Sequence, residues 1–141
     1  IHYDLRSQKP IRFVTSSSFS PLYAKIPSKE RAEKLVQTMM DKFGGEDKYL
    51  CASFDPTSDR FDPKKYWRGP VWINMNWILY HGLKNYGYTQ NAERVKNDSI
   101  ELLEKHDFFE YFDCRKGTEN AGYGGGNFSW SAALLIDLLN N

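Results

Sequence analysis

The sequence lacks several features that define common protein classes. Its 141 residues contain no apolar run long enough to cross a membrane, and its formal net charge is +1. A charge so close to zero gives little attraction for nucleic acid or an acidic membrane, so we expect neither as a partner. No signal-peptide pattern is visible, and the first residues, IHYDLRSQKP, resemble the interior of a longer polypeptide. The sequence does not determine the cellular compartment, although the cytoplasm is slightly favoured.

Patterns for metals and cofactors are also missing. Cys51 and Cys114 have no metal-binding or redox spacing, and His2, His81 and His106 are scattered along the chain. No phosphate-binding loop, dinucleotide fingerprint or nucleophile elbow occurs. We therefore predict no metal and no cofactor. The two cysteines are interpreted as buried thiols, with a single disulfide as the alternative.

Aromatic residues, in contrast, are abundant and unevenly placed. They make up 16% of the chain, and three of the four tryptophans fall within residues 66–77, YWRGPVWINMNW. One interpretation is a large hydrophobic core. The other is a sugar site, because sugar rings stack their apolar C–H faces on aromatic planes while their hydroxyls take hydrogen bonds. Composition alone favours the core.

Helical patterns of two kinds alternate along the chain. Residues 29–43 and 90–105 each carry one apolar stripe, with Ser28 and Thr89 as predicted N-caps. Residues 71–86 and 128–141 are apolar on nearly every side, as buried helices are. This alternation predicts an all-α fold in which outer helices cover inner ones. Residues 1–27 and 46–65 are expected to be extended or irregular.

These four predicted helices cannot bury all of their own apolar surface. Two one-sided helices do not cover two helices that are apolar all round, so some apolar surface remains for other chain to bury. We therefore expect residues 1–141 to be the end of a larger helical toroid with alternating outer and inner helices. A compact four-helix domain with a partner chain is the alternative.

The stretch YWRGPVW lies where a long loop meets an all-round apolar helix. Pro70 is predicted in the first helical turn, and Trp72 is expected inside that turn. The residues before Pro70 then lie at the N-terminal mouth of an inner helix, where N–H groups point outward and polar ligands collect. We interpret these residues as a binding site: Tyr66, Trp67, Arg68 and Trp72. Trp77 is interpreted as core.

A second candidate lies at residues 107–117, DFFEYFDCRKG. It sets Glu110 among aromatic side chains, where a carboxylate loses hydration and needs a partner; Arg68 is a candidate for that partner. Exposed glutamates are commoner, but the GYGGG loop at 122–126 and the FSW that follows favour a functional role. We interpret GYGGG as a loop that closes over a pocket, with a flexible connection as the alternative.

Three motifs, YWRGPVWINMNWILYHGL, EYFD and FSWSAALLIDLL, together resemble the C-terminal part of glycoside hydrolase family 63. SFSPLYAKIPSKERAEKLV is similar to a segment of the same enzymes, so the resemblance covers most of residues 13–139. The motif YWRGPVW is highly specific for this family. The trehalases of family 37 resemble this sequence more loosely. The resemblance implies an α/α toroid of helical hairpins and an inverting mechanism, in which one carboxylic acid protonates the leaving oxygen and a carboxylate activates water.

The resemblance also implies roles for particular residues. The general base of the family corresponds to Glu110, and the sugar-binding positions correspond to Tyr66, Trp67 and Trp72. Arg68 belongs to the same motif, and Trp130 of FSW matches an aromatic near the site, with a packing role as the alternative. The family's general acid is an aspartate in a loop rich in Gly, Trp and Asp, and this sequence has no such stretch.

The combined prediction is the C-terminal part of an inverting α-glycosidase that acts on an α-glucoside or α-mannoside. Its general acid would come from the remainder of the catalytic domain or from a partner chain. The preferred substrate is a compact one such as glucosyl- or mannosylglycerate. The alternatives are a non-catalytic sugar-binding or assembly fragment, a trehalase-like glycosidase, and a structural domain whose aromatic residues are all core.

Overall fold

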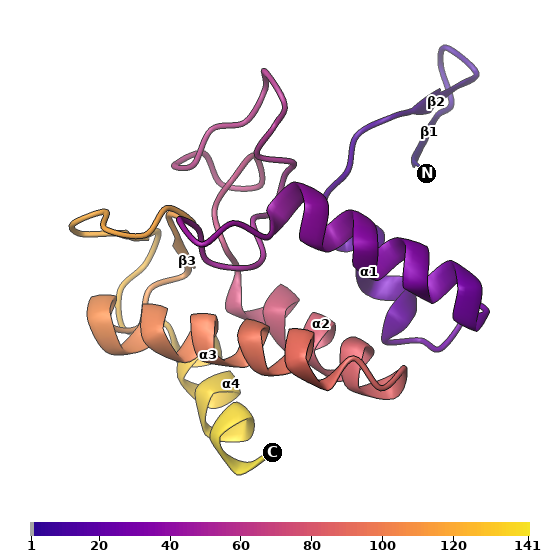
Figure 1. Ribbon diagram of the computed structural model, residues 1–141. Coiled ribbons are helices and arrows are strands. Elements are labelled where there is room, and N and C mark those ends of the chain that lie inside the picture. The colour runs from indigo at the N-terminus through magenta and orange to yellow at the C-terminus, as the bar shows by residue number, and fades with distance from the viewer. Residues whose placement is uncertain (1) are drawn as a thin grey trace.

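Residues 2–141 are described by a computed structural model in which helices dominate (Figure 1). Within this range the helices are η1 (Ser16–Leu22, a 3-10 helix), α1 (Lys29–Phe43), α2 (Ile73–Asn85), α3 (Thr89–His106) and α4 (Ser129–Asn140). The strands are only two or three residues long: β1 (His2–Asp4), β2 (Lys9–Ile11), β3 (Tyr111–Phe112) and β4 (Gly122–Tyr123). The all-α prediction is therefore confirmed.

Helix α1 forms where its sequence pattern predicts it. The hydroxyl of Ser28 accepts a hydrogen bond from the backbone N–H of Arg31 at 3.4 Å, which satisfies one free donor of the first turn. Gly44 is the C-cap. One stripe of the helix is buried, formed by Ala32, Val36, Met39 and Phe43, and the opposite face is exposed. This is the one-sided helix that the sequence predicts.

Two helix starts differ from the prediction. Helix α2 begins at Ile73, so Trp72 is its N-cap and Pro70 lies before the helix rather than in its first turn. The reason is tertiary: Val71 pairs with Ala52 and with Phe112, which keeps the chain extended up to Trp72. Helix α3 includes Thr89, and its N-cap is Tyr88 without a side-chain cap bond.

Helix α2 is the centre of the packing. It packs against α3 along its length, against η1 and against α4, while η1 also contacts α1 (Figure 1). Residues on several sides of α2 are consequently buried, among them Ile73, Met75, Asn76, Leu79 and Leu83. Helix α3 buries one stripe and exposes the other side. The predicted alternation of one-sided and all-round helices holds for α1, α2 and α3.

Helix α4 leaves apolar surface uncovered within the described chain. Leu138 is fully buried against the body, but Ile136 and Leu139 are 64% and 60% exposed. Trp130, in the first turn, is 52% exposed. Helix α4 thus has one covered side and one open apolar side, and the burial of the open side by further chain stays an expectation.

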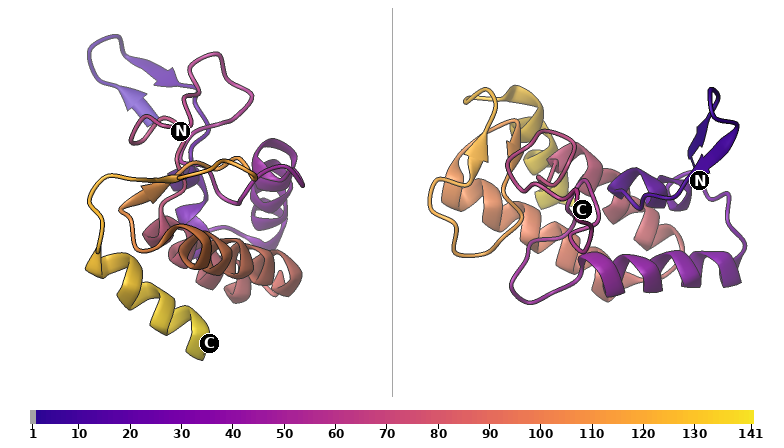
Figure 2. Two further views of the ribbon diagram at one scale, coloured as in Figure 1. Left: turned by 90° about the vertical axis from the view of Figure 1, so that its left-hand side faces the viewer. Right: turned by 90° about the horizontal axis from the view of Figure 1, so that it is seen from above.

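Residues 2–27 are more ordered than the sequence suggests. Strands β1 and β2 pair antiparallel and form a hairpin that stands away from the helices (Figure 2), and η1 follows it. The region 46–65 contains no helix or named strand, as predicted. None of the helices within residues 2–141 combines the length and the apolar character that a bilayer crossing requires.

Candidate functional site

A narrow antiparallel ladder joins the two sequence motifs. Val71 of YWRGPVW exchanges backbone hydrogen bonds with Phe112 of EYFD, with N–O distances of 2.7 and 2.9 Å. Val71 also pairs with Ala52, and Phe112 pairs with Gly122 of β4. Segments that lie far apart in the sequence are thus held side by side. The ladder explains why these motifs form one site.

The register of this ladder brings aromatic rings into a row. Because Val71 faces Phe112, their neighbours Trp72 and Tyr111 also face each other, and Tyr111 faces Tyr123 across the β3–β4 pair. The Trp72 and Tyr111 rings stack with centroids 5.1 Å apart, and those of Tyr111 and Tyr123 with centroids 6.1 Å apart. Trp67 continues the row by stacking on Trp72, at 4.0 Å and an angle of 3°.

Tyr66 stands edge-on to this stack and connects it to Glu110. Its ring makes T-shaped contacts with Trp67, Trp72 and Tyr111. Its backbone carbonyl accepts a hydrogen bond from the indole N–H of Trp72 at 3.0 Å, and its hydroxyl donates to Oε1 of Glu110 at 3.3 Å. The pKa of Tyr66 is raised, first by lost solvation and then by the charge and hydrogen bond of the Glu110 carboxylate.

The backbone of Tyr66 is strained. Its φ is +37°, in the left-handed region that residues with a side chain rarely adopt. A conformation of this kind costs roughly 1–3 kcal/mol and persists only where surrounding contacts hold it. The contacts of Tyr66 with Trp72 and Glu110 are such contacts.

Glu110 is half-buried directly before β3. Its backbone N–H donates to the carbonyl of Tyr123 at 3.2 Å. Gly124, at φ +78°, lies so close that a Cβ there would stand 2.5 Å from the carboxylate Oε2 of Glu110. The loop at 122–126 therefore packs on the carboxylate, and a side chain at position 124 would displace it.

A narrow gap beside Glu110, too tight to admit a water molecule, is bordered by two further predicted residues. It is lined by residues that include Glu110, Trp72, Asn74, Trp130 and Ser131, and we call it the Glu110 hollow. The hydroxyl of Ser131 donates to the carbonyl of Phe109 at 2.8 Å, which fixes the first turn of α4 next to EYFD. Of the site residues predicted from sequence, Glu110, Trp72 and Trp130 meet here, and Tyr66 and Trp67 adjoin.

The predicted binding rings differ in accessibility. Tyr66, Trp67 and Trp130 are 49%, 41% and 52% exposed, whereas Trp72 is 4% exposed. Trp72 stacks on Trp67 and Tyr111, so its ring faces other rings of the protein. The rings available to a ligand are Tyr66, Trp67 and Trp130, and Trp72 supports them.

Arg68 does not pair with Glu110. Its guanidinium donates to the backbone carbonyl of Arg60, from Nε at 3.2 Å and from Nη2 at 2.9 Å. It lines a different hollow, formed with Phe13, Phe54 and Arg60, which we call the Arg60 hollow. The expected pairing with Glu110 was wrong because position in a motif does not fix the direction of a long side chain.

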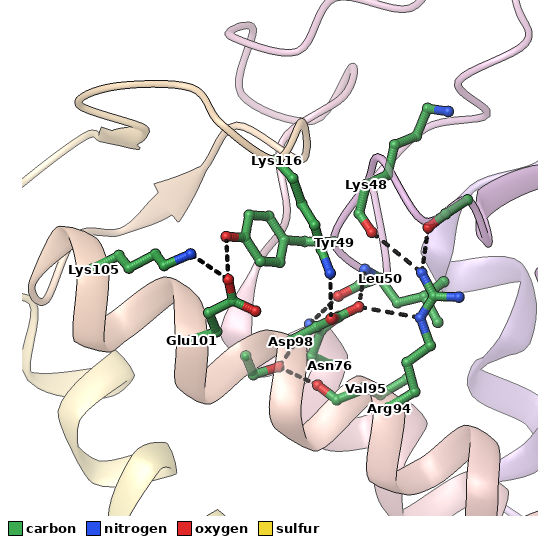
Figure 3. A network of polar contacts seen from close by, with 12 residues as sticks. Lys48, Tyr49, Leu50, Asn76, Arg94, Val95, Asp98, Glu101, Lys105 and Lys116 are labelled. Atoms are coloured by element: carbon green, nitrogen blue, oxygen red, sulfur yellow. Dashed lines mark hydrogen bonds and ion pairs between the residues drawn. The ribbon is translucent and has the colours of Figure 1, made fainter.

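Behind the site, a buried polar network holds the segment that leads into the ladder (Figure 3). Asn76 of α2 is fully buried, and its amide accepts from the N–H of Cys51 at 2.9 Å and donates to the carbonyl of Leu50 at 2.7 Å. It also donates to the hydroxyl of Ser99 of α3 at 2.8 Å. Asn76 thus ties α3 and the segment before Ala52 to the same point.

Asp98 of α3 is the second anchor of this network (Figure 3). It is 5% exposed and accepts the backbone N–H of Leu50 at 2.8 Å. Arg94 and Lys116 lie 3.5 and 3.6 Å from its carboxylate oxygens. Since Lys116 follows the EYFD segment, Asp98 connects the chain on both sides of the ladder.

The residues that hold the site together were not singled out from sequence. Tyr111 and Tyr123 extend the aromatic row, and Gly124 contacts the carboxylate. Tyr111 lies within EYFD and Tyr123 within GYGGG, but only the ladder register shows that they face Trp72. Cys51 and Cys114 are both buried and free, which confirms the interpretation as thiols. Among residues 2–141, no three His, Cys, Asp or Glu side chains come together as a metal site would require.

Comparisons with known proteins identify relatives over nearly the whole chain. The family described as "Mannosylglycerate hydrolase MGH1-like glycoside hydrolase domain" matches residues 1–131. A mannosylglycerate hydrolase of Thermus thermophilus is 45% identical over 134 residues, which are 95% of this chain and 31% of that protein. The chain therefore spans about a third of the length of this relative.

Solved structures agree with this result. The GH63 mannosylglycerate hydrolase from a second strain of Thermus thermophilus has a TM-score of 0.87 in complex with glucose and 0.88 in complex with Tris and D-glycerate. The identities are 41% and 42%, over 99% of this chain and 34% and 32% of those chains. Neutral trehalase Nth1 from Saccharomyces cerevisiae, at 23% identity over 98% of this chain and 25% of its own, has a TM-score of 0.76 and shows the fold alone. The predicted fold, part of an α/α toroid, is confirmed.

Proposed function

Since the chain belongs to the mannosylglycerate hydrolase MGH1-like glycoside hydrolase family, within glycoside hydrolase family 63, we propose that it is the C-terminal part of an inverting α-glycosidase. The substrate is an α-mannoside or α-glucoside of a small acid, with mannosylglycerate preferred. The relative from Thermus thermophilus, named a mannosylglycerate hydrolase, supports this choice. The remainder of the catalytic domain, or a partner chain, supplies the rest of the site.

The observation that carries the proposal is the position of Glu110. Its carboxylate borders the Glu110 hollow together with Trp130, and its one side-chain hydrogen bond is donated by Tyr66. A carboxylate in this setting keeps free lone pairs with which it can accept a proton from water. We assign Glu110 as the general base, which activates the water that attacks the anomeric carbon.

The general acid has to lie outside this chain. In an inverting glycosidase the acid and the base stand about 6.5–9.5 Å apart, with the water and the sugar between them. Glu110 supplies the carboxylate of the Glu110 hollow. The acid then approaches from the opposite face of the sugar, and the remainder of the catalytic domain or a partner chain supplies it.

Exposed aromatic rings supply the surface on which the sugar rests. Tyr66, Trp67 and Trp130 each present roughly half of their area beside Glu110. Sugar C–H faces pack on such rings, while the sugar hydroxyls bond to polar groups at the rim. Trp72 acts as the support of Trp67 in this arrangement.

A non-catalytic sugar-binding protein is the second candidate. It is favoured by the single carboxylate that the described chain contributes to the Glu110 hollow, because inversion needs two. The two candidates differ in whether bound sugar is cleaved.

The test is Glu110→Gln in the complete protein that contains this chain. Glutamine keeps the size and the hydrogen-bond acceptor for Tyr66 but cannot accept a proton, so we expect turnover of mannosylglycerate to fall about 10²–10⁴-fold. Sugar binding, measured by calorimetry, should change by less than about threefold. The matched control is Glu119→Gln, an exposed glutamate in the same region, which should keep full activity. Preserved turnover in Glu110→Gln rejects the base assignment, and binding without turnover in the unaltered protein supports the second candidate.

A further inference from the structure

Arg68 closes the segment that presents Tyr66 and Trp67. The guanidinium of Arg68 donates two hydrogen bonds, of 3.2 and 2.9 Å, to the carbonyl of Arg60. The backbone of the same residue makes two more: its N–H donates to the carbonyl of Lys65 at 2.7 Å, and its carbonyl accepts the N–H of Asp62 at 2.8 Å. Residues 60–68, which we call the 60–68 loop, are thus closed at Arg68 by four hydrogen bonds.

Gly69 completes this closure. A Cβ at position 69 would overlap the backbone of Asp62 and Pro63. The far side of the 60–68 loop therefore rests on the chain directly after Arg68, at a distance that only glycine permits. Gly69 is buried, and its N–H donates to the hydroxyl of Ser53 at 3.1 Å. The loop is anchored to the segment that enters the ladder.

The two rings that leave this loop rest on Trp72, but each keeps an open side. Tyr66 and Trp67 are about half exposed, at 49% and 41%, and Tyr66 holds a left-handed backbone at φ +37°. A strained residue of this kind needs its neighbours to fix it. Ring contacts with Trp72 and Glu110 hold the side chain of Tyr66, and the closure at Arg68 fixes the backbone that follows it.

The direction of the Arg68 side chain argues against a sugar contact. Arg68 lines the Arg60 hollow with Phe13 and Phe54, whereas Glu110 and Trp130 line the Glu110 hollow. Two of its N–H donors are already used on the Arg60 carbonyl. The guanidinium places two N–H groups of one rigid plane on a single carbonyl oxygen, a fixed geometry that the rotatable donors of an ammonium group do not provide.

We propose that Arg68 is a positioning residue, which places Tyr66 and Trp67 for the sugar by closing the 60–68 loop, and that it does not touch the substrate. The proposal rests on the proposed function. It extends that function by separating two residues of one motif: Trp67 contacts the ligand, and its neighbour Arg68 sets where Trp67 lies.

The experiment uses the complete protein labelled with 5-fluorotryptophan, with the ¹⁹F resonance of Trp67 assigned by its loss in Trp67→Phe. Arg68→Lys keeps the charge, and Arg68→Met keeps much of the stem. In both we expect the Trp67 resonance of the ligand-free protein to shift or broaden. The KM for mannosylglycerate should rise about tenfold, with kcat reduced less than threefold, because apparent affinity falls with the fraction of loop in the competent conformation.

The matched control is Arg60→Met. It removes the other arginine of the Arg60 hollow but leaves the backbone carbonyl that Arg68 uses. We expect its Trp67 resonance and KM to match those of the unaltered protein. A KM rise in Arg60→Met would show that the charge of the hollow matters, and it would overturn the proposal.

Two other results would overturn it as well. A raised KM in Arg68→Lys with an unchanged Trp67 resonance would make Arg68 a direct ligand. An unchanged KM and resonance in both Arg68 variants would leave it no positioning role. If the unaltered protein hydrolyses no glycoside, the proposed function fails. In that case the ¹⁹F resonance of Trp67 in the ligand-free protein still decides whether Arg68 positions Trp67.

Discussion

Asn76 offers a sharp test of how the ladder is held in place. Its side chain is fully buried and makes three hydrogen bonds, to the N–H of Cys51, the carbonyl of Leu50 and the hydroxyl of Ser99. Two of these bond the chain immediately before Ala52, which pairs with Val71. Asn76→Ala removes all three at once and leaves a buried N–H and a buried carbonyl without their partner.

The expected cost follows from those two groups. A buried backbone donor or acceptor that loses its partner costs about 1–3 kcal/mol, so the pair together should cost about 3–5 kcal/mol, with the small cavity included. This free energy applies to the local opening of residues 50–52, because the two lost backbone hydrogen bonds are made to that segment. Each 1.4 kcal/mol is a factor of ten, so amide exchange at Cys51 should accelerate by about 10² to 4 × 10³-fold.

Hydrogen–deuterium exchange of the complete protein, read on peptides that contain residues 49–54, measures this directly. Ser99→Ala is the matched control, since it removes one partner of Asn76 and keeps both bonds to the chain at residues 50 and 51. We expect it to accelerate exchange by about tenfold or less, the value of one hydrogen bond. Equal acceleration in the two variants would refute the reasoning, because the fastening of residues 50 and 51 would then not depend on Asn76.

Two further predictions concern the exposed rings and the thiols. Trp67→Ala should raise the KM for mannosylglycerate about tenfold through loss of a stacking surface, while the melting temperature stays within a few degrees; a collapsed melting transition would make Trp67 core instead. Burial raises the pKa of the Cys114 thiol to about 12 from an ordinary value of 9.0, and the thiolate is the reactive form. Iodoacetamide at pH 8 should therefore label Cys114 about a thousandfold more slowly in the native protein than in urea; comparable rates, followed by mass spectrometry, would contradict its burial.

Caps and apolar stripes in the sequence predict where the helices lie. They do not predict which distant segments pair with the helix ends. The Ser28 cap and the apolar stripe of α1 lie within one short window, so the sequence predicts this helix closely. The sequence pattern places the start of α2 too early, because Val71 pairs with Phe112, a residue in a different motif. Pro70 and Trp72 look like a first helical turn only when that pairing is ignored.

The same distinction holds for the site residues. A run of aromatics predicts that rings gather, but it does not tell which ring is covered: Trp72 is 4% exposed and Trp67 is 41% exposed, although both belong to one motif. The sequence suggests a cation, Arg68, as the partner of Glu110, whereas the structure supplies a hydroxyl from Tyr66. Arg68 instead bonds a carbonyl eight residues earlier, a contact that no spacing rule predicts.

The ladder also explains why the two motifs constrain each other. Side chains alternate between faces along an extended chain, so a shift of one residue in either partner turns every side chain to the opposite face. With Val71 opposite Phe112, the rings of Trp72, Tyr111 and Tyr123 share a face. A slip by one residue would leave Tyr111 opposite Val71 and break the row on which Trp67 rests. YWRGPVW and EYFD therefore act as one structural unit, in which the pairing at Val71 sets the position of the rings beside Glu110.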